Sequence, residues 1–387
     1  MSSGRIWFAL ALMSLLAAGC ATPPVVDVQP GERPPLESDE AGFWMVMDRV
    51  EERVRTSGHV VRDERLNAYV RDIFCQLTLD YCNDIRLYLV RSAYFNASMM
   101  ANGTMQVWTG MLLRTQNEAQ LAAVLGHELT HYLRRHTLQR WRDIRAKTDA
   151  LIFFQLATAV AGVGIVGTFA SLATAGSIQA FSRDMEREAD QLGFEMMAKA
   201  GYDPRETPKI WEMMIAEKEA SNRPKGSIFF ASHPTSQERR DTLTKMAAGY
   251  DSDTAKLGRE RFVEMTARYR GDWLRDELRQ RDFGSLQVVL DYLMEAGANP
   301  GELQYFQGEL HRLRGEEEED DEAKAVEAYE MAIDTGGGPP EAHRALGLVY
   351  WSAGRKDEAR GAFEAYIEAA PEADDRAMVE YYLQQFE

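Results

Sequence analysis

Cysteine and basic charge are scarce in this sequence, and each shortage excludes a class of protein. Only three cysteines occur in 387 residues, which excludes a small disulfide-stabilised scaffold. Lysine and arginine total 44 against 61 acidic residues, for a formal net charge of −17, so we expect no nucleic-acid partner. Hydrophobic residues make up 45% of the chain, which indicates a folded protein, and the length predicts two or three domains.

The N-terminal segment has the features of a secretion signal. Arg5 precedes a 13-residue apolar stretch at residues 6–18, which is too short to span a bilayer as a helix. The run from Leu16 to Cys20 resembles the lipobox of bacterial lipoproteins, in which the cysteine is lipidated. Ala17 stands where that pattern favours leucine, so cleavage by an ordinary signal peptidase stays open, and secretion is expected either way.

We therefore expect a lipoprotein signal peptide at residues 1–20 and a membrane contact through lipid on Cys20. Residues 21–40 hold five of the 13 prolines and predict an extended tether. By the sorting tendency of lipoproteins, Ala21 indicates the outer membrane, so the expected location is the periplasmic face of the bacterial envelope.

Two cysteines, Cys75 and Cys82, remain once Cys20 is set aside. An even pair in an oxidising compartment favours a local disulfide, and two buried thiols flanking a turn are the alternative. Because the loop between them is short, a bridge would add little loop-closure stability.

Residues 127–131 read His-Glu-Leu-Thr-His and match the H-E-x-x-H pattern of zinc sites. A rotation of 100° per residue places His127 and His131 about 40° apart on one helix face, so both imidazoles can reach one ion. The stretch from residue 119 to about 142 predicts a single long helix. On that helix His136 would point about 180° away from His127, so we assign it a packing or capping role.

A catalytic zinc site needs a third protein ligand and leaves one position for water. Glu186 is the best candidate, and Asp190 lies four residues later on the same face of a predicted helix at residues 182–200. One carboxylate could bind metal while the other orients a histidine from behind it. Acidic pairs at this spacing usually lie on a solvated face, and the upstream motif reverses that interpretation.

These residues resemble a known family, the zinc metallopeptidases that include CAAX prenyl endopeptidase and the periplasmic BepA-type proteases (metallopeptidase family 48). The resemblance covers about residues 45–245. It rests on four ordered blocks: Asn96-Ala97 with Gly103 and Thr109-Gly110, the helix at residues 121–128, the motif from Glu186 to Asp190, and Ser232-His233-Pro234 with Arg239.

The resemblance implies a zinc endopeptidase with one zinc ion per chain, acting on protein or peptide substrates. The implied ligands are His127, His131 and Glu186, and Glu128 is the implied general base. Other implied site residues are Asp190 and His233 at the catalytic centre, and Asn96, Thr109, Gly110 and Arg239 along the substrate cleft.

Two of these residues keep alternative roles. His233 either occupies the open zinc position and holds the enzyme off, as the resemblance suggests, or caps the next helix, where Pro234 suits the first turn. Arg239 either pairs with an acidic residue of the site or stabilises a tetrahedral oxyanion.

Two short strands are predicted before the H-E-x-x-H helix, at residues 85–90 and 104–109, with a turn-rich connection at 96–103. An extended substrate could pair with an exposed strand edge near residues 104–109 through backbone hydrogen bonds, which read little sequence.

Residues 150–182 carry no charged side chain. One membrane crossing would put the two metal-binding helices on opposite sides of the bilayer, so we expect the stretch not to span it. It is either a buried helical hairpin beneath the site, a surface loop that touches membrane or unfolded client, or a plug over the cleft.

The C-terminal part has the spacing of a tetratricopeptide repeat, a 34-residue helix pair. An earlier copy contains an acidic insertion at residues 316–321, and a degenerate unit precedes it. We expect two and a half repeats that present a surface for partners, and plain helical packing that caps the protease is the alternative. The repeat positions are Leu346, Gly347, Tyr350, Gly354, Ala359, Phe363 and Pro371.

The predicted fold is mostly α with a small β-sheet: an α+β zincin-like metalloprotease domain at residues 41–250 and a C-terminal α-solenoid of tetratricopeptide-like repeats at 251–387. The expected function is proteolysis of misfolded or unassembled outer-membrane or periplasmic proteins, with the repeats contacting outer-membrane assembly machinery. A periplasmic chaperone or assembly adaptor with a closed metal site is the alternative, and Glu128 argues against it because a structural site needs no base. Prenyl-protein processing is a weaker rival, since the chain lacks a multi-span membrane core.

Overall fold

The computed structural model describes residues 27–147, 181–222, 229, 232–234, 237–251, 253–315 and 320–386. Within these ranges the chain is mostly helical with one small sheet, as predicted. The predicted signal peptide, the predicted lipidation residue Cys20, and residues 150–180 of the uncharged stretch lie outside them. Among the described helices, none combines the length and the apolar character needed to cross a membrane.

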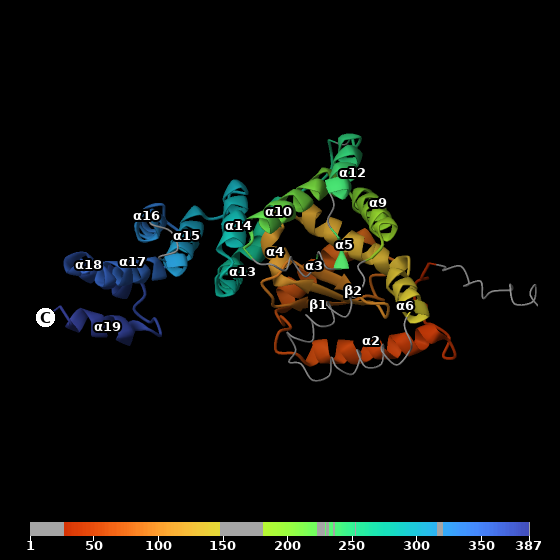
Figure 1. The fold of residues 1–387 in the computed structure, drawn as a ribbon, viewed down its shortest axis with the longest axis horizontal. Helices are drawn as coiled ribbons and strands as arrows, with labels where there is room; N and C mark the ends of the chain where they lie inside the picture. Colours follow the sequence, from red (N-terminus) through yellow and green to blue (C-terminus); the bar gives the residue numbers. More distant parts are fainter. Residues whose placement is uncertain are drawn as a thin grey trace, which may run out of the picture.

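The helices fall into two groups along the chain (Figure 1). The first group is α2 (Asp39–Thr56), α3 (Glu64–Leu77), α4 (Thr109–Arg114), α5 (Glu118–Leu133), α6 (His136–Lys147), α9 (Arg183–Lys199), the 3-10 turn η2 (Pro204–Glu206), α10 (Thr207–Ala220) and α12 (Gln237–Ala248). The second group is α13 (Arg259–Gln280), α14 (Phe283–Glu295), α15 (Pro300–Arg314), α16 (Asp321–Asp334), α17 (Glu341–Ser352), α18 (Lys356–Ala369) and α19 (Arg376–Gln384).

The sheet has the strand order β1, β3, β2. The central strand β3 (Thr104–Trp108) pairs in parallel with β1 (Arg86–Val90) and antiparallel with β2 (Ala97–Met99). All five residues of β3 are buried. The prediction of an exposed edge at residues 104–109 is therefore wrong, and β2, which the sequence analysis treated as part of a connection, lies at one edge of the sheet.

Helices cover both faces of the sheet, because successive strand residues point to opposite sides. On one face Val50 and Val54 of α2 pack with Val90 of β1 and Trp108 of β3. The neighbouring strand residues point to the other face and join the main core, which also includes α3 and α5. Figure 1 shows α2 below the sheet and α5 above it. The sheet thus fixes one side of the helix that carries the H-E-x-x-H residues.

The predicted long helix at residues 119–142 is wrong, because the chain bends between α5 and α6. Arg135 has φ 52°, in the left-handed region that L residues rarely adopt. Its guanidinium pairs with the carboxylates of Glu32 and Glu40, which lie far away in the sequence. These tertiary contacts offset the backbone cost, and they redirect the chain immediately before His136.

The described part of the predicted tether packs against the domain. Val28 is 3% exposed, its N–H donates to the Leu133 carbonyl at 3.0 Å, and its own carbonyl accepts from the Tyr81 hydroxyl at 2.8 Å. Helix α2 then begins at Asp39. The prediction of an extended tether to residue 40 is therefore wrong for residues 27–38.

A disulfide joins Cys75 of α3 to Cys82, with the two Cα atoms 4.9 Å apart. This is the bridge that the even cysteine pair favours. It closes the turn between α3 and β1, next to the N-terminal segment that Tyr81 holds.

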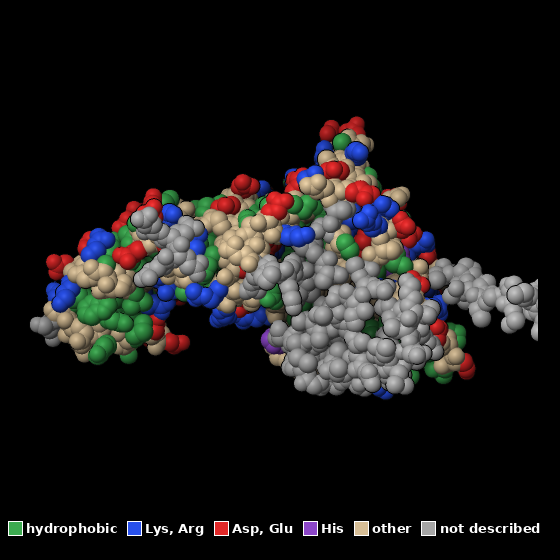
Figure 2. Space-filling view, in the orientation of Figure 1, with side chains coloured by type: hydrophobic (Ala, Val, Ile, Leu, Met, Phe, Trp, Pro, Cys, Tyr) green, Lys and Arg blue, Asp and Glu red, His purple; other side chains and the backbone are tan. Residues whose placement is uncertain are grey.

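The second group of helices packs in chain order as helical hairpins and extends away from the sheet (Figure 1). A Cβ at Gly308 would lie 2.5 Å from the ring of Tyr329, and one at Gly347 would lie 2.6 Å from the ring of Phe363. Both hairpins thus use a glycine to admit an aromatic ring from the partner helix. Assignment of these hairpins to the tetratricopeptide class stays a prediction. Apolar side chains gather over the last helices in Figure 2, where Tyr381 of α19 is exposed.

The two groups of helices share one continuous apolar core. Arg114 of α4 is buried between them, where it pairs with Glu217 of α10 and with Glu277 of α13, at 2.6 Å in each case. The predicted boundary between residues 250 and 251 therefore does not separate two independent cores.

Candidate metal centre

Helices α5 and α9 come close enough to share a site because two glycines face each other. A Cβ on Gly193 of α9 would lie 2.8 Å from the backbone nitrogen of His127, and one on Gly126 would lie 3.2 Å from the Gly193 carbonyl oxygen. Only residues without a side chain allow this approach of two backbones. It brings the carboxylates of Glu186 and Asp190 to the two histidines of α5.

Four buried residues converge at this crossing: His127, His131, Glu186 and His233. Each offers one ligand atom, and these atoms lie within 4.8 Å of one another. The sequence analysis predicts the first three as ligands, and the structure brings them together. The fourth residue comes from the segment before α12.

The spacing of these atoms fits a metal ion. The Nε2 atom of His127 is 3.1 Å from Nε2 of His131, 3.3 Å from Nδ1 of His233 and 3.5 Å from Oε2 of Glu186. Metal–nitrogen distances of about 2.0–2.1 Å place the ligands of a tetrahedral ion about 3.3–3.4 Å apart. The donor set of three imidazoles and a carboxylate therefore suits a borderline-soft divalent ion.

Glu128 lies beside the cluster and is 1% exposed. Its Oε1 atom is 3.4 Å from Nε2 of His233 and has no hydrogen-bond donor among the described residues. Burial, assisted by the negative charge of Glu186 and opposed by His127 and Arg239, raises the pKa of the Glu128 carboxyl to about 8. A carboxyl with this pKa can both release and hold a proton near neutral pH.

Asp190 and Arg239 lie outside the ligand cluster and pair with its members and with each other. Oδ1 of Asp190 is 3.1 Å from Nδ1 of His127, so this carboxylate orients a predicted ligand from outside the cluster. Arg239 donates to both oxygens of Asp190, at 2.7 and 2.6 Å, and its Nη1 is 2.5 Å from Oε2 of Glu186. Of the two roles left open for Arg239, the geometry favours pairing with acidic residues. Burial alone would raise the pKa of Asp190, but the Arg239 charge holds it below its usual range.

His136 is outside the ligand cluster, and its buried imidazole packs against His131, which fits the predicted packing role. The prediction that it points away from the site is wrong. The Nδ1 atom of His136 is 3.0 Å from Nδ1 of His131, and its Nε2 is 3.0 Å from Oε2 of Glu188. The bend at Arg135 causes the difference, because His136 starts a new helix. Burial lowers the pKa of the His136 imidazole, which is thereby kept neutral, and Glu188 opposes this shift. Sequence reasoning missed Glu188, which carries no signal beyond its place near Glu186.

The predicted cleft residues Asn96, Thr109 and Gly110 lie outside the ligand cluster, and all three are packed into the fold. The Thr109 hydroxyl donates to the Ser92 carbonyl at 3.0 Å, and the Gly110 N–H donates to the same oxygen at 2.7 Å. The Asn96 carbonyl accepts from the Trp108 N–H at 3.0 Å. Their observed contacts hold the segment that leads into β2.

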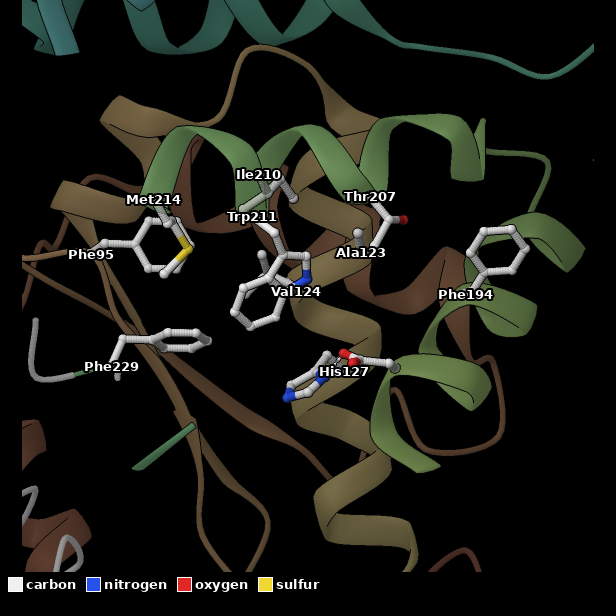
Figure 3. A pocket seen from close by; sticks show the side chains of 11 residues that line it. Phe95, Ala123, Val124, His127, Phe194, Thr207, Ile210, Trp211, Met214 and Phe229 are labelled. Atoms are coloured by element: carbon white, nitrogen blue, oxygen red, sulfur yellow. Dashed lines mark ion pairs between the residues drawn. The ribbon is translucent and has the colours of Figure 1, made fainter. Parts of the chain in front are cut away.

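An apolar pocket adjoins the cluster, and His127 forms part of its wall (Figure 3). It lies between α5, α9 and α10. Its lining is Phe95, Ala123, Val124, His127, Asp190, Phe194, Thr207, Ile210, Trp211, Met214 and Phe229.

The fold and the site together define a class of protein. Two histidines one helical turn apart, a glutamate between them, and a carboxylate supplied by a second helix form the metal-binding arrangement of a metallopeptidase. Residues 61–247 match the sequence model described as Peptidase family M48. Over residues 61–247 the chain is therefore similar to the metallopeptidases of family M48.

Several curated proteins are similar to part of this chain. The putative beta-barrel assembly-enhancing protease of Vibrio cholerae is 26% identical over 258 residues, which are 62% of this chain and 52% of that protein. The beta-barrel assembly-enhancing protease of Escherichia coli is 25% identical over 199 residues, 48% of this chain and 40% of that protein. The mitochondrial metalloendopeptidase OMA1 of Schizosaccharomyces pombe is 32% identical over 154 residues, 40% of this chain and 44% of that protein. The chain thus spans about half of the length of these relatives, or less.

Proposed function

We propose that this chain is a zinc-dependent endopeptidase of the bacterial envelope that cleaves misfolded or unassembled polypeptides. The observation that carries the proposal is the buried cluster of His127, His131 and Glu186 with the Glu128 carboxylate beside it, whose Oε1 atom has no hydrogen-bond donor among the described residues. The family match and the names of the relatives support proteolysis. The donor set supports zinc, which prefers imidazole nitrogen and carboxylate oxygen in a four-coordinate site.

The residues around the cluster have different roles in peptide hydrolysis. Zinc, when bound, is a Lewis acid that polarises the scissile carbonyl and lowers the pKa of water. Glu128 accepts the proton of the attacking water at its carboxylate and later gives it to the leaving amine. Asp190 keeps His127 in the tautomer that presents Nε2 to the cluster.

His233 controls access in this proposal. Its Nδ1 atom lies 3.0 Å from Oε1 of Glu186, so the imidazole takes the position that water needs. A site with four protein ligands is closed to water, and a catalytic site keeps one position open. We propose that His233 holds the peptidase off until it leaves the cluster.

The wider setting of the proposal comes from the sequence and from the relatives. Lipid on Cys20 would anchor the chain at the periplasmic face of the outer membrane, and the C-terminal hairpins would contact outer-membrane assembly machinery. The Vibrio and Escherichia relatives are named as beta-barrel assembly-enhancing proteases, which supports the proposed contact with assembly machinery. Strand β2, an edge of the sheet close to α5, would pair with an extended substrate.

The proposal is tested with the chain freed of its predicted signal peptide and incubated with casein and zinc. We expect Glu128→Gln to abolish cleavage and His233→Ala to raise it. If the wild type and both variants, with zinc bound, are as inert as a chelated wild-type sample, the function is an assembly adaptor with a closed metal site.

A further inference from the structure

The apolar pocket beside His127 is built on the same helix as the cluster (Figure 3). Ala123 and Val124 lie about one turn before His127 on α5, and Ile210, Trp211 and Met214 of α10 form the facing wall. A side chain in this pocket would therefore lie next to a predicted metal ligand. Its backbone would then pass the position where hydrolysis is proposed.

The lining of the pocket favours an apolar side chain. Only three lining residues are polar: His127, Asp190 and Thr207. Both oxygens of Asp190 already accept hydrogen bonds from Arg239, so the carboxylate offers little to an incoming cation. A charged guest would lose its hydration without gaining a partner.

One aromatic ring joins this pocket to His233. Phe229 is 2% exposed and lines the pocket, where its ring packs edge-on against Phe95 with centroids 5.1 Å apart. The same ring stacks on the His233 imidazole, with centroids 4.5 Å apart and planes 19° apart. The backbone N–H of His233 also donates a hydrogen bond to the Phe229 carbonyl at 2.7 Å. The two residues are thus coupled through both ring and backbone.

Because Phe229 contacts both the pocket lining and His233, a change in the pocket can alter the position of His233. A large apolar side chain that enters the pocket competes with Phe229 for contact with Phe95 and Trp211, whose ring centroids lie 5.1 and 5.9 Å from that of Phe229. When the Phe229 ring is displaced, the stacking that helps to hold His233 in the cluster is lost.

We propose that the pocket receives a large apolar side chain of the substrate, from a residue flanking the scissile bond, and that its entry displaces Phe229 and withdraws His233. The inference rests on the proposed peptidase function and names its substrate class: polypeptides that expose leucine-sized or aromatic side chains. Folded proteins bury these side chains, so the same contact would select unfolded clients and open the site for them.

The test uses internally quenched peptides taken from a mapped casein cleavage site, identical except for Leu, Phe, Ala or Lys at each flanking position. We expect the wild type to cleave the Leu or Phe peptide at least about 10-fold faster than the Ala peptide at one position, in kcat/KM. Met214→Ala enlarges the pocket and should shift the preference from Leu towards Phe, whereas Ala123→Leu fills it and should reduce the preference for both.

Met213→Ala is the matched control, because Met213 is an equally buried methionine of α10 that does not line the pocket. Its Leu-to-Ala ratio should equal that of the wild type. Phe229→Ala should speed cleavage of the Ala peptide several-fold, because His233 loses its stacking partner. Peptide binding to the Glu128→Gln protein, measured by fluorescence anisotropy, should show the same order of preference without turnover.

The outcomes separate this inference from the proposed function. Cleavage by the wild type with equal rates for Leu and Ala peptides, or a preference that both pocket variants leave unchanged, would overturn the pocket assignment alone. An unchanged or lower rate for Phe229→Ala on the Ala peptide would overturn the coupling to His233. Absence of cleavage by the wild type and by His233→Ala would overturn the peptidase function itself.

Discussion

Replacement of Arg114 tests how the metal-site helices and the C-terminal helices are held together. The Arg114 guanidinium is buried and donates to Glu217 at 2.6 and 2.8 Å and to Glu277 at 2.6 Å. It also donates to the carbonyls of Ala93 and Gly110, at 3.0 Å each. Arg114→Leu therefore leaves two carboxylates and two carbonyl oxygens short of a donor.

The expected loss of folding stability follows from the burial of the carboxylates that Arg114 contacts. Removal of one member of a buried ion pair typically costs about 3–5 kcal/mol, because the remaining charge has no compensation. Burial already raises the pKa of Glu277, and Arg114 is the main opposing influence. Without Arg114 the pKa of Glu277 rises further, so its carboxyl binds a proton more readily in the folded than in the unfolded chain. The destabilisation should then be largest at high pH and should decrease as the pH falls through that raised pKa.

Urea unfolding followed by circular dichroism at pH 8 and pH 5.5 measures both effects. The exposed pair of Arg275 and Asp272 on α13 supplies the control, since Arg275→Leu removes an arginine from a solvated pair and should cost far less. The double variant Arg114→Leu, Glu277→Leu should regain part of the loss, because it removes one unpaired charge. A loss for Arg114→Leu no larger than that for Arg275→Leu, or one that does not vary with pH, would refute the reasoning.

Three further predictions concern the metal centre and the sheet. Asp190→Asn removes the carboxylate 3.1 Å from His127 Nδ1 and should weaken zinc binding about 10–100-fold, as measured by chelator competition. Chelation of the metal should lower the thermal midpoint of the wild type, and added zinc should restore it, because binding stabilises the folded state alone. Burial would raise the pKa of Glu51, but hydrogen bonds from Arg86 and others hold it below the usual 4.5. The stability advantage over Glu51→Gln, followed by urea unfolding, should therefore be full above about pH 4.5 and disappear as the pH falls through the folded value.

Local periodicity accounts for the part of the site that could be predicted from the sequence. The spacing of His127 and His131, and that of Glu186 and Asp190, fixes each pair on one helix face whatever surrounds it. The distance between the two pairs depends on how closely the helices pack. That closeness is set by Gly126 and Gly193, whose sequence contexts do not distinguish them from other helical glycines.

The errors share a different cause, which is tertiary contact overriding a local pattern. Strand β2 has three residues, too few for an alternating pattern, and it exists because β3 pairs with it. No proline or glycine marks the bend at Arg135 in the sequence. The bend depends on Glu32 and Glu40, which lie in a distant segment. The ion pair with Glu32 also helps to hold the segment before α2 against the domain, together with the hydrogen bonds of Val28.

Helix α10 contributes to three features of the structure outside the H-E-x-x-H helix. It forms one wall of the apolar pocket, it supplies Glu217 to the buried arginine, and it packs against α14, where a Cβ on Gly284 would meet the Ala220 carbonyl at 1.9 Å. The family match ends at residue 247, yet α14, which packs on α10, comes after that point. Since a pocket wall keeps its shape only when its far side is packed, α14 supports the pocket through α10.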